Sequence, residues 1–326
     1  MIVKRREINT MNLQLIENDY TFKELCNFYI EKKQSCKKST TLQCDLYSLR
    51  KFDEINDYKI KDITPDIIQD ILNEMNMNGL STGYINKVRS IINKIFNFAL
   101  EQELISSSPV LKVYKIKRPD ELKKEMSYWT LSEFECFSEH VAAKDTKYYV
   151  LFNILYYMGC RKGEALALQW GDINFSKRTI RINKTIAQQL RGVSYKLTPP
   201  KTANSIRTIK IPSKLYDILL ERYNNAKFYR DFNSTFFVVG GNYPMSLKYV
   251  GPKFKEYSIK ANLPIIRIHD LRHSHASLLI NQGANIKAIA SRLGDNVDTV
   301  LSVYTHLFHE TEDELVSIID HAYDRL

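Results

Sequence analysis

The sequence lacks the signatures of several protein classes. Its five cysteines form no Cys-x-x-Cys pair, which predicts reduced thiols and not a zinc or disulfide framework. No apolar run approaches the ~18–20 residues that a membrane span needs, and the basic amino terminus has no apolar signal-peptide core. The chain also has no glycine-rich phosphate loop, no internal repeat and no low-complexity segment. What remains is a globular protein without a membrane partner, and a cytoplasmic location is the default expectation.

Length and charge narrow the remaining classes. At 326 residues the chain is long enough for two domains, on the usual prior of ~100–200 residues per domain. Its 44% of apolar and 26% of charged residues are ordinary for a globular protein. The net charge is +10, and most of this excess of Lys and Arg lies after residue 126. Such an excess suits a polyanionic partner, most commonly nucleic acid.

The first part of the chain predicts a small all-α domain over residues 21–103, after an N-terminal extension over residues 1–20. A capping box, TFKE, begins at Thr21, and Pro65 suits the first position of a helix capped by Thr64. Apolar residues recur with helical spacing in four segments. The stretch 104–126 then has two prolines and a serine run without an apolar stripe, which predicts a linker. This basic linker is either a solvated tether or a strand that lies along a DNA backbone.

The second domain is expected over residues 127–326. It begins with a second capping box, TLSE, at Thr130, and an apolar helix follows up to Met158. Alternating β-branched residues predict strands at 179–188 and 206–211, with Lys201 in a hairpin turn between them. Helical patterns return from residue 213 onward. The domain is therefore expected to be mainly helical with one small antiparallel sheet.

Four segments of this domain concentrate polar residues that can carry chemistry. They are GCRKGEALALQWGDI (159–173), PPKTANSIRTIKIP (199–212), RIHDLRHSHAS (267–277) and RLGDNVDTVLSVYTHL (292–307). Each also has a purely structural interpretation. Arg161 can brace its helix through a buried ion pair with Glu164, Lys201 can be a solvated turn lysine, and Tyr304 can be a core tyrosine.

The third segment raises the question of a metal site. His269 and His273 are four residues apart, as on a zinc-binding helix, but such a helix needs Glu after the first histidine and this chain has Asp270. His269 and Arg272, three residues apart, instead put an imidazole beside a guanidinium on one helix face. We therefore expect no metal and no cofactor, and structural roles for His273 and His275 in helix packing or toward DNA.

In this order, the Arg…Lys…His-x-x-Arg…Tyr residues of the four segments resemble the tyrosine recombinases, or phage-type integrases. The matching text is spread over most of residues 127–310. The resemblance implies a helical, SAM-like core-binding domain at 21–103 and an α+β catalytic domain of the kind found in DNA breaking-rejoining enzymes. It also implies a site-specific recombinase that cleaves and rejoins DNA through a 3′-phosphotyrosyl intermediate, without ATP or metal, for integration and excision of a mobile element.

The resemblance also implies residue roles. Arg161 and Arg272 would hold the non-bridging oxygens of the scissile phosphate, Lys201 would protonate the departing 5′-hydroxyl, His269 would assist proton transfer, and Tyr304 would be the nucleophile. These residue types suit the chemistry, since rigid guanidinium forks match the equatorial oxygens of a phosphoryl transition state. A phenol with a reference pKa of ~10 needs a base and a positive field to attack at neutral pH.

Double-stranded DNA is the partner that follows, with the two domains closing around it as a clamp. Backbone contacts are expected to dominate its affinity. The residues expected to contact it directly are Lys115, Lys117, Arg118 and Arg207. Strand exchange would require a homotetramer on paired sites, and accessory DNA-bending proteins would fit such an assembly. The amphipathic tail helix at 308–326 either packs on a neighbouring protomer or on its own domain.

The sequence departs from the family pattern at two places. The family commonly has LGH where this chain has LGD, so Asp295 replaces a second active-site histidine. Because a phosphate would repel a carboxylate, Asp295 is expected either to accept hydrogen bonds from Arg272 or Tyr304 or to turn outward. His306, two residues past Tyr304, is a candidate to replace the missing histidine. The alternative function, a DNA-binding protein with reduced or lost catalysis, depends on this residue. Second, residues 1–20 are too few for an arm-binding domain, which predicts recombination of simple sites or a truncated chain.

Overall fold

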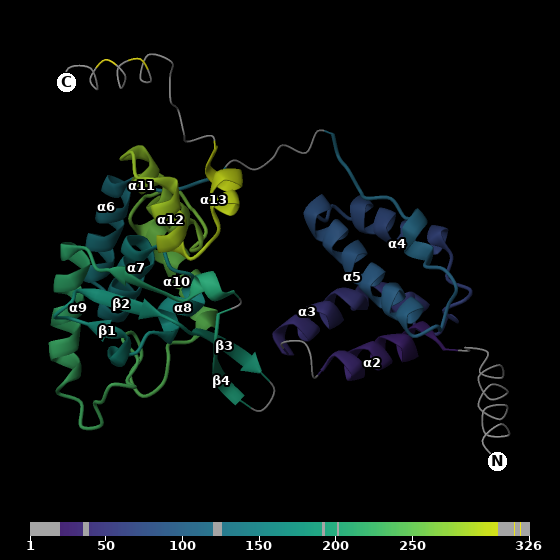
Figure 1. Cartoon of the computed structure of the whole chain (residues 1–326), viewed down its shortest axis with the longest axis horizontal. Helices are drawn as coiled ribbons and strands as arrows, with labels where there is room; N and C mark the ends of the chain where they lie inside the picture. Colours follow the sequence, from purple (N-terminus) through teal and green to yellow (C-terminus); the bar gives the residue numbers. More distant parts are fainter. Residues whose placement is uncertain are drawn as a thin grey trace. The chain divides into compact units, whose positions relative to one another are not determined.

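The structure is a computed structural model that describes residues 20–34, 39–119, 126–190, 193–200, 202–305, 316 and 320. The chain divides into two compact units, the first ending at residue 123 and the second beginning at residue 124. Each unit has its own apolar core, and Figure 1 shows their elements in sequence colours.

The first unit is all-helical, as the sequence predicts. Its elements are α2 (Phe22–Lys33), α3 (Ser39–Leu49), η1 (Arg50–Ile55), α4 (Pro65–Met77), α5 (Thr82–Glu101) and η2 (Pro109–Lys112). The caps expected at Thr21 and Thr64 are present, and Ser81 caps α5. The side chain of each accepts a hydrogen bond from a backbone N–H of the following helix. The apolar faces of these helices meet in one core around Phe22, where Phe52 and Phe96 pack against its ring.

The segment expected to be a linker packs against the helical unit over residues 104–118. Val110 and Val113 are buried in the helical core. The Arg89 guanidinium donates to the Val113 carbonyl at 2.7 and 3.0 Å, and the Asn86 amide exchanges two hydrogen bonds with Ile116. Two buried valines and several backbone hydrogen bonds attach this segment to the helical core. Because these contacts do not need an apolar stripe, the sequence pattern did not predict them, and this part of the chain belongs to the helical unit.

The second unit is mainly helical with a small amount of antiparallel sheet, the fold class that the sequence predicts. Its larger helices are α6 (Leu131–Ala142), α7 (Thr146–Met158), α9 (Ser213–Ala226) and α10 (Leu247–Lys260), and the short α8 (Lys162–Ala167) and η3 (Trp170–Asp172) follow α7. Aromatic rings fill the core between α6, α7 and α10, where Trp129, Phe137 and Phe152 all pack around Phe254. This core packs against α7, and the first residue of the candidate site, Arg161, follows the end of that helix.

The strands form two separate antiparallel sheets, not the single sheet that the sequence predicts. β1 (Ile173–Asn174), β2 (Thr179–Ile182) and β5 (Arg207–Lys210) pair in that order, and β3 (Thr185–Leu190) pairs with β4 (Val193–Thr198) as a hairpin (Figure 1). The expected strand 179–188 is thus divided between the two sheets. The strands on either side of residue 201, β4 and β5, belong to different sheets, and the expected hairpin turn at Lys201 itself lies outside the described residues.

Three helices near the carboxyl end form a separate small core. They are α11 (Asp270–Asn281), α12 (Ile286–Leu293) and α13 (Val297–Tyr304). Their buried residues are Ala276, Ile280, Ile289, Ala290, Leu293, Val300 and Tyr304. The predicted nucleophile is therefore a packed member of this core. The expected tail helix, 308–326, lies outside the described residues apart from residues 316 and 320.

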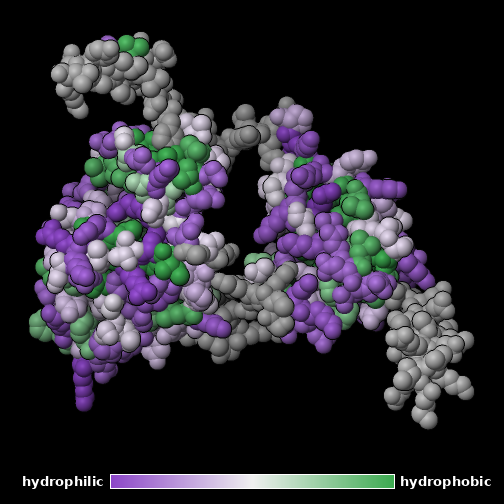
Figure 2. All heavy atoms as spheres, in the orientation of Figure 1, coloured by the Kyte–Doolittle hydropathy of each residue, from purple (hydrophilic) through white to green (hydrophobic). Residues whose placement is uncertain are grey.

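The face of the molecule drawn in Figure 2 is predominantly polar. Figure 2 shows hydrophilic side chains over much of the face in view, with small hydrophobic patches between them. Within the described ranges, no helix combines the length and the hydropathy that crossing a membrane requires.

Candidate active site

Arg161 lies where α7 ends and α8 begins. Gly159 ends α7 in the left-handed conformation (φ 59°), and a Cβ at this position would come within 2.5 Å of the His275 ring, so glycine is required. The chain then places Arg161 at the N-cap of α8. Its backbone N–H and its Nη1 donate to the two carboxylate oxygens of Glu164 at 3.0 and 3.1 Å. The Arg161–Glu164 ion pair of the structural interpretation is present, and it leaves Nη2 of Arg161 to bind another partner.

Arg272 is held in place by backbone carbonyls. Its side chain is almost fully buried, and Nη1 donates to the backbone carbonyls of Gly159 at 2.7 Å and Leu293 at 2.9 Å. The guanidinium on α11 therefore joins the ends of α7 and α12. Nη2 donates to Asp295. Because two backbone carbonyls fix its plane, Arg272 presents this second nitrogen in one orientation.

The carboxylate of Asp295 lies between the two arginines. Oδ1 accepts from Nη2 of Arg161 at 2.5 Å, and Oδ2 accepts from Nη2 of Arg272. Burial alone would raise the pKa of Asp295, but the Arg272 and Arg161 guanidiniums outweigh burial and hold that pKa below its ordinary value. Of the alternatives left open by the sequence, Asp295 thus faces inward and accepts from Arg272. Arg161 is a second donor that the sequence did not reveal.

Arg161 is supported by a buried ion pair between Glu164 and Arg207. Glu164 is 3% exposed and accepts from Nη2 of Arg207 at 3.0 Å. Burial tends to raise the pKa of Glu164, but Arg207 outweighs it and the pKa is lowered. Arg207 also donates to the carbonyls of Arg292 and Ser205, at 2.7 and 2.9 Å. The structure therefore corrects the expectation that Arg207 contacts DNA, because its guanidinium is buried and its donors bind protein oxygens.

A cavity of about 360 Å³ opens in front of Arg161 and Asp295. It is also lined by Glu164, Thr185, Pro200, Thr202, Asn204, Ser205, Gly294, Asn296 and Thr299. The hydroxyl of Ser205 lies 2.9 Å from that of Thr202 and 3.5 Å from Nη1 of Arg161. Lys201 itself lies outside the described residues, but both of its chain neighbours line this cavity. Ser205 is a site residue that sequence reasoning missed, since a serine in a loop carries no distinguishing pattern.

Tyr304 ends α13 with its side chain only 4% exposed. Its hydroxyl lies 2.7 Å from Nδ1 of His273, one turn along α11 from His269. Burial raises the pKa of Tyr304, and the Arg272 charge opposes that rise. Burial lowers the pKa of His273 to about 4, so its imidazole is neutral at pH 7. The sequence assigned His273 a structural role, but the structure puts it in contact with the predicted nucleophile.

His269 caps the amino end of α11, and its ring lies edge-on to that of His273, with 5.5 Å between centroids. Partial burial and then the charge of Arg272 lower the pKa of His269, and Arg161 adds to this effect. His269 is therefore within electrostatic range of both arginines. The helical spacing of His269 and Arg272 thus brings an imidazole and a guanidinium to one site, as the sequence predicts.

The basic residues expected to contact DNA from the linker differ from one another. Lys115 and Lys117 are exposed. Arg118 instead donates to the Asn76 side chain at 2.8 Å and to the carbonyls of Asn76 and Leu80 at 3.0 and 2.9 Å. Arg118 therefore fastens the chain to the end of α4, and the two lysines keep their charges in solvent.

The described residues include no group of three or more His, Cys, Asp and Glu side chains that could hold a metal ion. Four of the cysteines are described, and all four are free thiols. Burial raises the pKa of Cys26 and Cys160 to about 12, so neither is a nucleophile at neutral pH.

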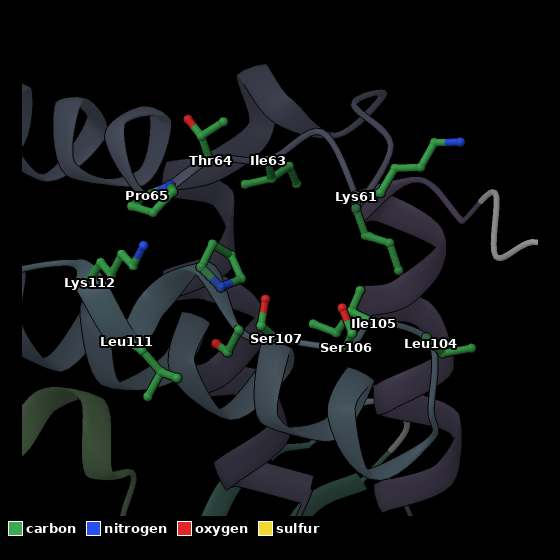
Figure 3. Close-up of a pocket in the computed structure, with 13 residues that line it drawn as sticks. Lys61, Ile63, Thr64, Pro65, Leu104, Ile105, Ser106, Ser107, Leu111 and Lys112 are labelled. Carbon is green, nitrogen blue, oxygen red and sulfur yellow. The ribbon is translucent and has the colours of Figure 1, made fainter.

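A larger hollow lies in the helical unit, with a volume of about 740 Å³. Figure 3 shows Lys61 and Lys112 on opposite sides of it, with Thr64, Ser106 and Ser107 between them. Its lining residues include no carboxylate, imidazole or thiol. The hollow therefore offers hydroxyl and ammonium groups for contacts but no acid–base pair.

Comparison with known families gives two matches. Residues 130–311 match the model described as the phage integrase family, and residues 21–76 match that of the phage integrase N-terminal SAM-like domain. Among curated proteins, the chain is 31% identical over 312 residues to the ICEBs1 integrase of Bacillus subtilis strain 168, covering 92% of this chain and 83% of that protein. It is 26% identical to a tyrosine recombinase XerC-like protein of Caldanaerobacter subterraneus, covering 83% and 74%.

Solved structures share the fold. The Tn1549 transposon integrase in complex with a circular intermediate DNA superposes with a TM-score of 0.77 at 22% identity, covering 93% of this chain and 99% of that one. A lambda integrase dimer bound to a COC′ core site superposes with a TM-score of 0.65 at 18% identity, covering 93% and 80%. The arrangement of a helical unit followed by a mixed catalytic unit is therefore common to this chain and to these DNA-bound proteins.

Proposed function

Since this chain belongs to the phage integrase family and is a site-specific DNA recombinase, we propose that it cuts and rejoins DNA strands through a 3′-phosphotyrosyl bond to Tyr304. The observation that carries this proposal is the Asp295 carboxylate, which offers one oxygen to Arg161 and one to Arg272. A phosphodiester has two non-bridging oxygens that can make the same pair of charge-assisted hydrogen bonds. We infer that the scissile phosphate takes the place of this carboxylate.

The arginine pair then acts on the transition state. The pentacoordinate phosphorus gathers negative charge on its equatorial oxygens, and two guanidiniums fixed in advance stabilise that charge without reorganising. Arg272 is fixed by two backbone carbonyls and Arg161 by Glu164. We assign the phenolic oxygen of Tyr304 as the nucleophile, Lys201 as the acid that protonates the departing 5′-oxygen, and His269 as a neighbour that assists proton transfer.

The product conserves the energy of the cleaved bond. A phosphotyrosyl ester replaces a phosphodiester, so a 5′-hydroxyl of another strand can reverse the reaction without ATP. The related integrases act for mobile elements, and we propose integration and excision of such an element as the biological role of this chain. For the location of this reaction, we propose the cytoplasm.

The partner is double-stranded DNA. The Tn1549 and lambda integrases were each solved on DNA, the latter also as a tetramer bound to a Holliday junction. For this chain we propose the same assembly, with four copies on two paired sites, the C-terminal tail joining neighbours and DNA-bending proteins assisting. Lys115 and Lys117 are exposed and are suited to phosphate contacts, and the net charge of +10 makes such binding salt-dependent.

A second candidate, a DNA-binding protein that has lost turnover, is favoured by Asp295 because its carboxylate competes with the phosphate for both arginines. A suicide substrate with a nick beside the cleavage site separates the two functions. A recombinase accumulates a covalent protein–DNA adduct that is absent in Tyr304→Phe and insensitive to EDTA. A pure binder gives only a salt-sensitive mobility shift, and this result from the unmodified protein would overturn the proposal.

A further inference from the structure

The nucleophile requires a proton acceptor, and one imidazole touches it. Nδ1 of His273 lies 2.7 Å from the hydroxyl of Tyr304, with the two rings 5.6 Å apart between centroids. On the basis of the proposed function, we propose that His273 is the general base that removes the phenolic proton of Tyr304 and returns it when the strand is rejoined. His269, Arg161 and Arg272 then act on the phosphate side of the reaction.

The contact is fixed by packing on both sides. Tyr304 is a member of the buried core of α11, α12 and α13, which restricts its ring. His273 is carried by α11, and its side chain is 16% exposed. The hydroxyl and the acceptor nitrogen therefore meet because α13 packs beside α11, and neither side chain needs to move for the proton to pass over this distance.

The tautomer suits a base. If Nδ1 accepts from the phenol, the proton of the neutral ring is on Nε2. Nε2 lies 4.0 Å from Oδ1 of Asp270, and Asp270 is buried. Its carboxylate is held by the side chain of Arg267 at 2.8 Å and by the backbone N–H of that residue at 2.8 Å. A fixed negative charge thus faces the side of the ring that becomes positive after proton transfer.

The surroundings keep His273 unprotonated before the reaction. Burial is the largest cause of the lowered pKa of His273, and the nearby imidazole of His269 lowers this pKa further. The guanidiniums of Arg267 and Arg272 act in the same direction, whereas the negative charge of Asp270 opposes them. The neutral ring therefore has its acceptor nitrogen free for the phenolic proton. The titratable and charged groups that face the His273–Tyr304 pair are His269, Asp270, Arg267, Arg272 and Asp295.

Bonds and protons balance in the proposed step. The oxygen of Tyr304 forms a bond to the scissile phosphorus while the bond from phosphorus to the 5′-oxygen breaks. The phenolic proton moves to Nδ1 of His273, which becomes an imidazolium facing Asp270. The departing 5′-oxygen takes its proton from the general acid, for which Lys201 is proposed above. Rejoining runs the same transfers in reverse.

Two substitutions separate a base from a residue that only orients the phenol. The side-chain amide of His273→Asn can occupy the place of Nδ1 and hold the hydroxyl, but it cannot carry a proton. His273→Ala removes both contacts. For a base, both variants lose about 10²–10⁴-fold in the single-turnover rate of adduct formation on the nicked substrate. His140→Asn, on α6, serves as the matched control with an unchanged rate.

The pH profile gives a readout that a structural role would not change. With a base, the rate of the unmodified protein levels off once His273 is neutral, whereas the rate of His273→Asn continues to rise toward the pKa of the phenol. A substrate with a 5′-bridging sulfur, whose thiolate leaves without an acid, should leave the His273→Asn defect in place. Folding of each variant is checked by its melting temperature and its affinity for uncleaved DNA.

Three outcomes would overturn the inference. A His273→Asn rate within about threefold of that of the unmodified protein would reduce His273 to an orienting residue, since proton transfer by a positioned base contributes far more. A faster His273→Ala would show that His273 restrains Tyr304. Rescue of His273→Asn by the 5′-sulfur would make it part of the acid pathway. If the unmodified protein forms no adduct on any substrate, the proposed function fails instead, so the two failures are distinguishable.

Discussion

Asp295 accepts a hydrogen bond of 2.5 Å from Nη2 of Arg161, while its second oxygen accepts from Arg272. One carboxylate thus holds the two arginines at the spacing of two adjacent oxygens. This arrangement orients both guanidiniums in the absence of DNA, and it also places a negative charge where the phosphate is proposed to bind. Asp295 therefore favours catalysis by orienting the arginines and opposes it by competing with the phosphate. A substitution at Asp295 shows which of these two effects on the cleavage rate is larger.

We predict that Asp295→His cleaves at least as fast as the unmodified protein. The imidazole removes the charge that competes with the phosphate, and it supplies a donor at the position where the family commonly has one. The measurement is the single-turnover rate of adduct formation on a nicked substrate. A large loss of rate would mean that the carboxylate is required to hold the arginines, and the prediction would be wrong.

We predict that Arg272→Lys lowers the cleavage rate by about 10²–10³-fold, the usual cost of removing one preorganised oxyanion donor. An ammonium on a flexible stem cannot bind two backbone carbonyls and an oxyanion in one plane. DNA affinity should change much less than the rate, because backbone contacts elsewhere remain. Arg181→Lys, on the exposed side of β2, is the matched control and should retain the full rate.

We predict that Glu164→Gln destabilises the catalytic unit by about 3–5 kcal/mol, because it leaves the buried Arg207 charge without its carboxylate. The two tryptophans, Trp129 and Trp170, both lie in this unit, so tryptophan fluorescence during urea unfolding reports on it alone. An unchanged unfolding midpoint would show that Arg207 finds another partner.

The same carboxylate gives a pH dependence of stability. The pKa of Glu164 is lowered in the folded protein, so its contribution is fully present above the unfolded value of about 4.3 and is lost as pH falls through the folded value. The unmodified protein should therefore lose this stability in acid below about pH 4, and Glu164→Gln should show a smaller loss over that range. Parallel unfolding curves for the two proteins would contradict the assignment.

We predict that Lys115→Ala with Lys117→Ala weakens DNA binding and makes the affinity less sensitive to salt. The slope of log affinity against log salt should fall by about one for each of these lysines that binds a phosphate. Arg118→Ala is the informative comparison. Its guanidinium binds Asn76 and Leu80, so its loss should lower the melting temperature of the helical unit more than it changes the salt slope. Equal effects of the lysine and arginine substitutions on that slope would show that Arg118 leaves these partners on DNA.

The features that the sequence predicted correctly depend on residues close to one another in the chain. The helices of the first unit follow from apolar periodicity and from caps such as Thr64, which depend only on neighbouring residues. The order of Arg161, His269, Arg272 and Tyr304 indicated the family because the chemistry requires those residue types. Comparison with relatives confirms the family and the fold. The individual roles remain predictions until the substitutions above are made.

The remaining features depend on packing between distant segments. Arg207 is buried because it shares the inward face of β5 with Ile209. The alternation of inward and outward residues can be found in the sequence, but the positive charge of Arg207 suggested an exposed residue. The contact between His273 and Tyr304 joins residues 31 positions apart and exists only because α13 packs beside α11. No local pattern distinguishes that histidine from His275, which is buried and accepts a hydrogen bond from Arg292 instead.

The burial of Tyr304 among α11, α12 and α13 has a consequence for the division of labour among copies of the protein. To serve a phosphate bound by another copy, this tyrosine would have to leave the core that it helps to form. We therefore expect each subunit to cut the strand that its own arginines hold. Mixing a copy that lacks the phenol with one that lacks Arg272 should then restore no cleavage, because neither subunit can lend the other its missing group.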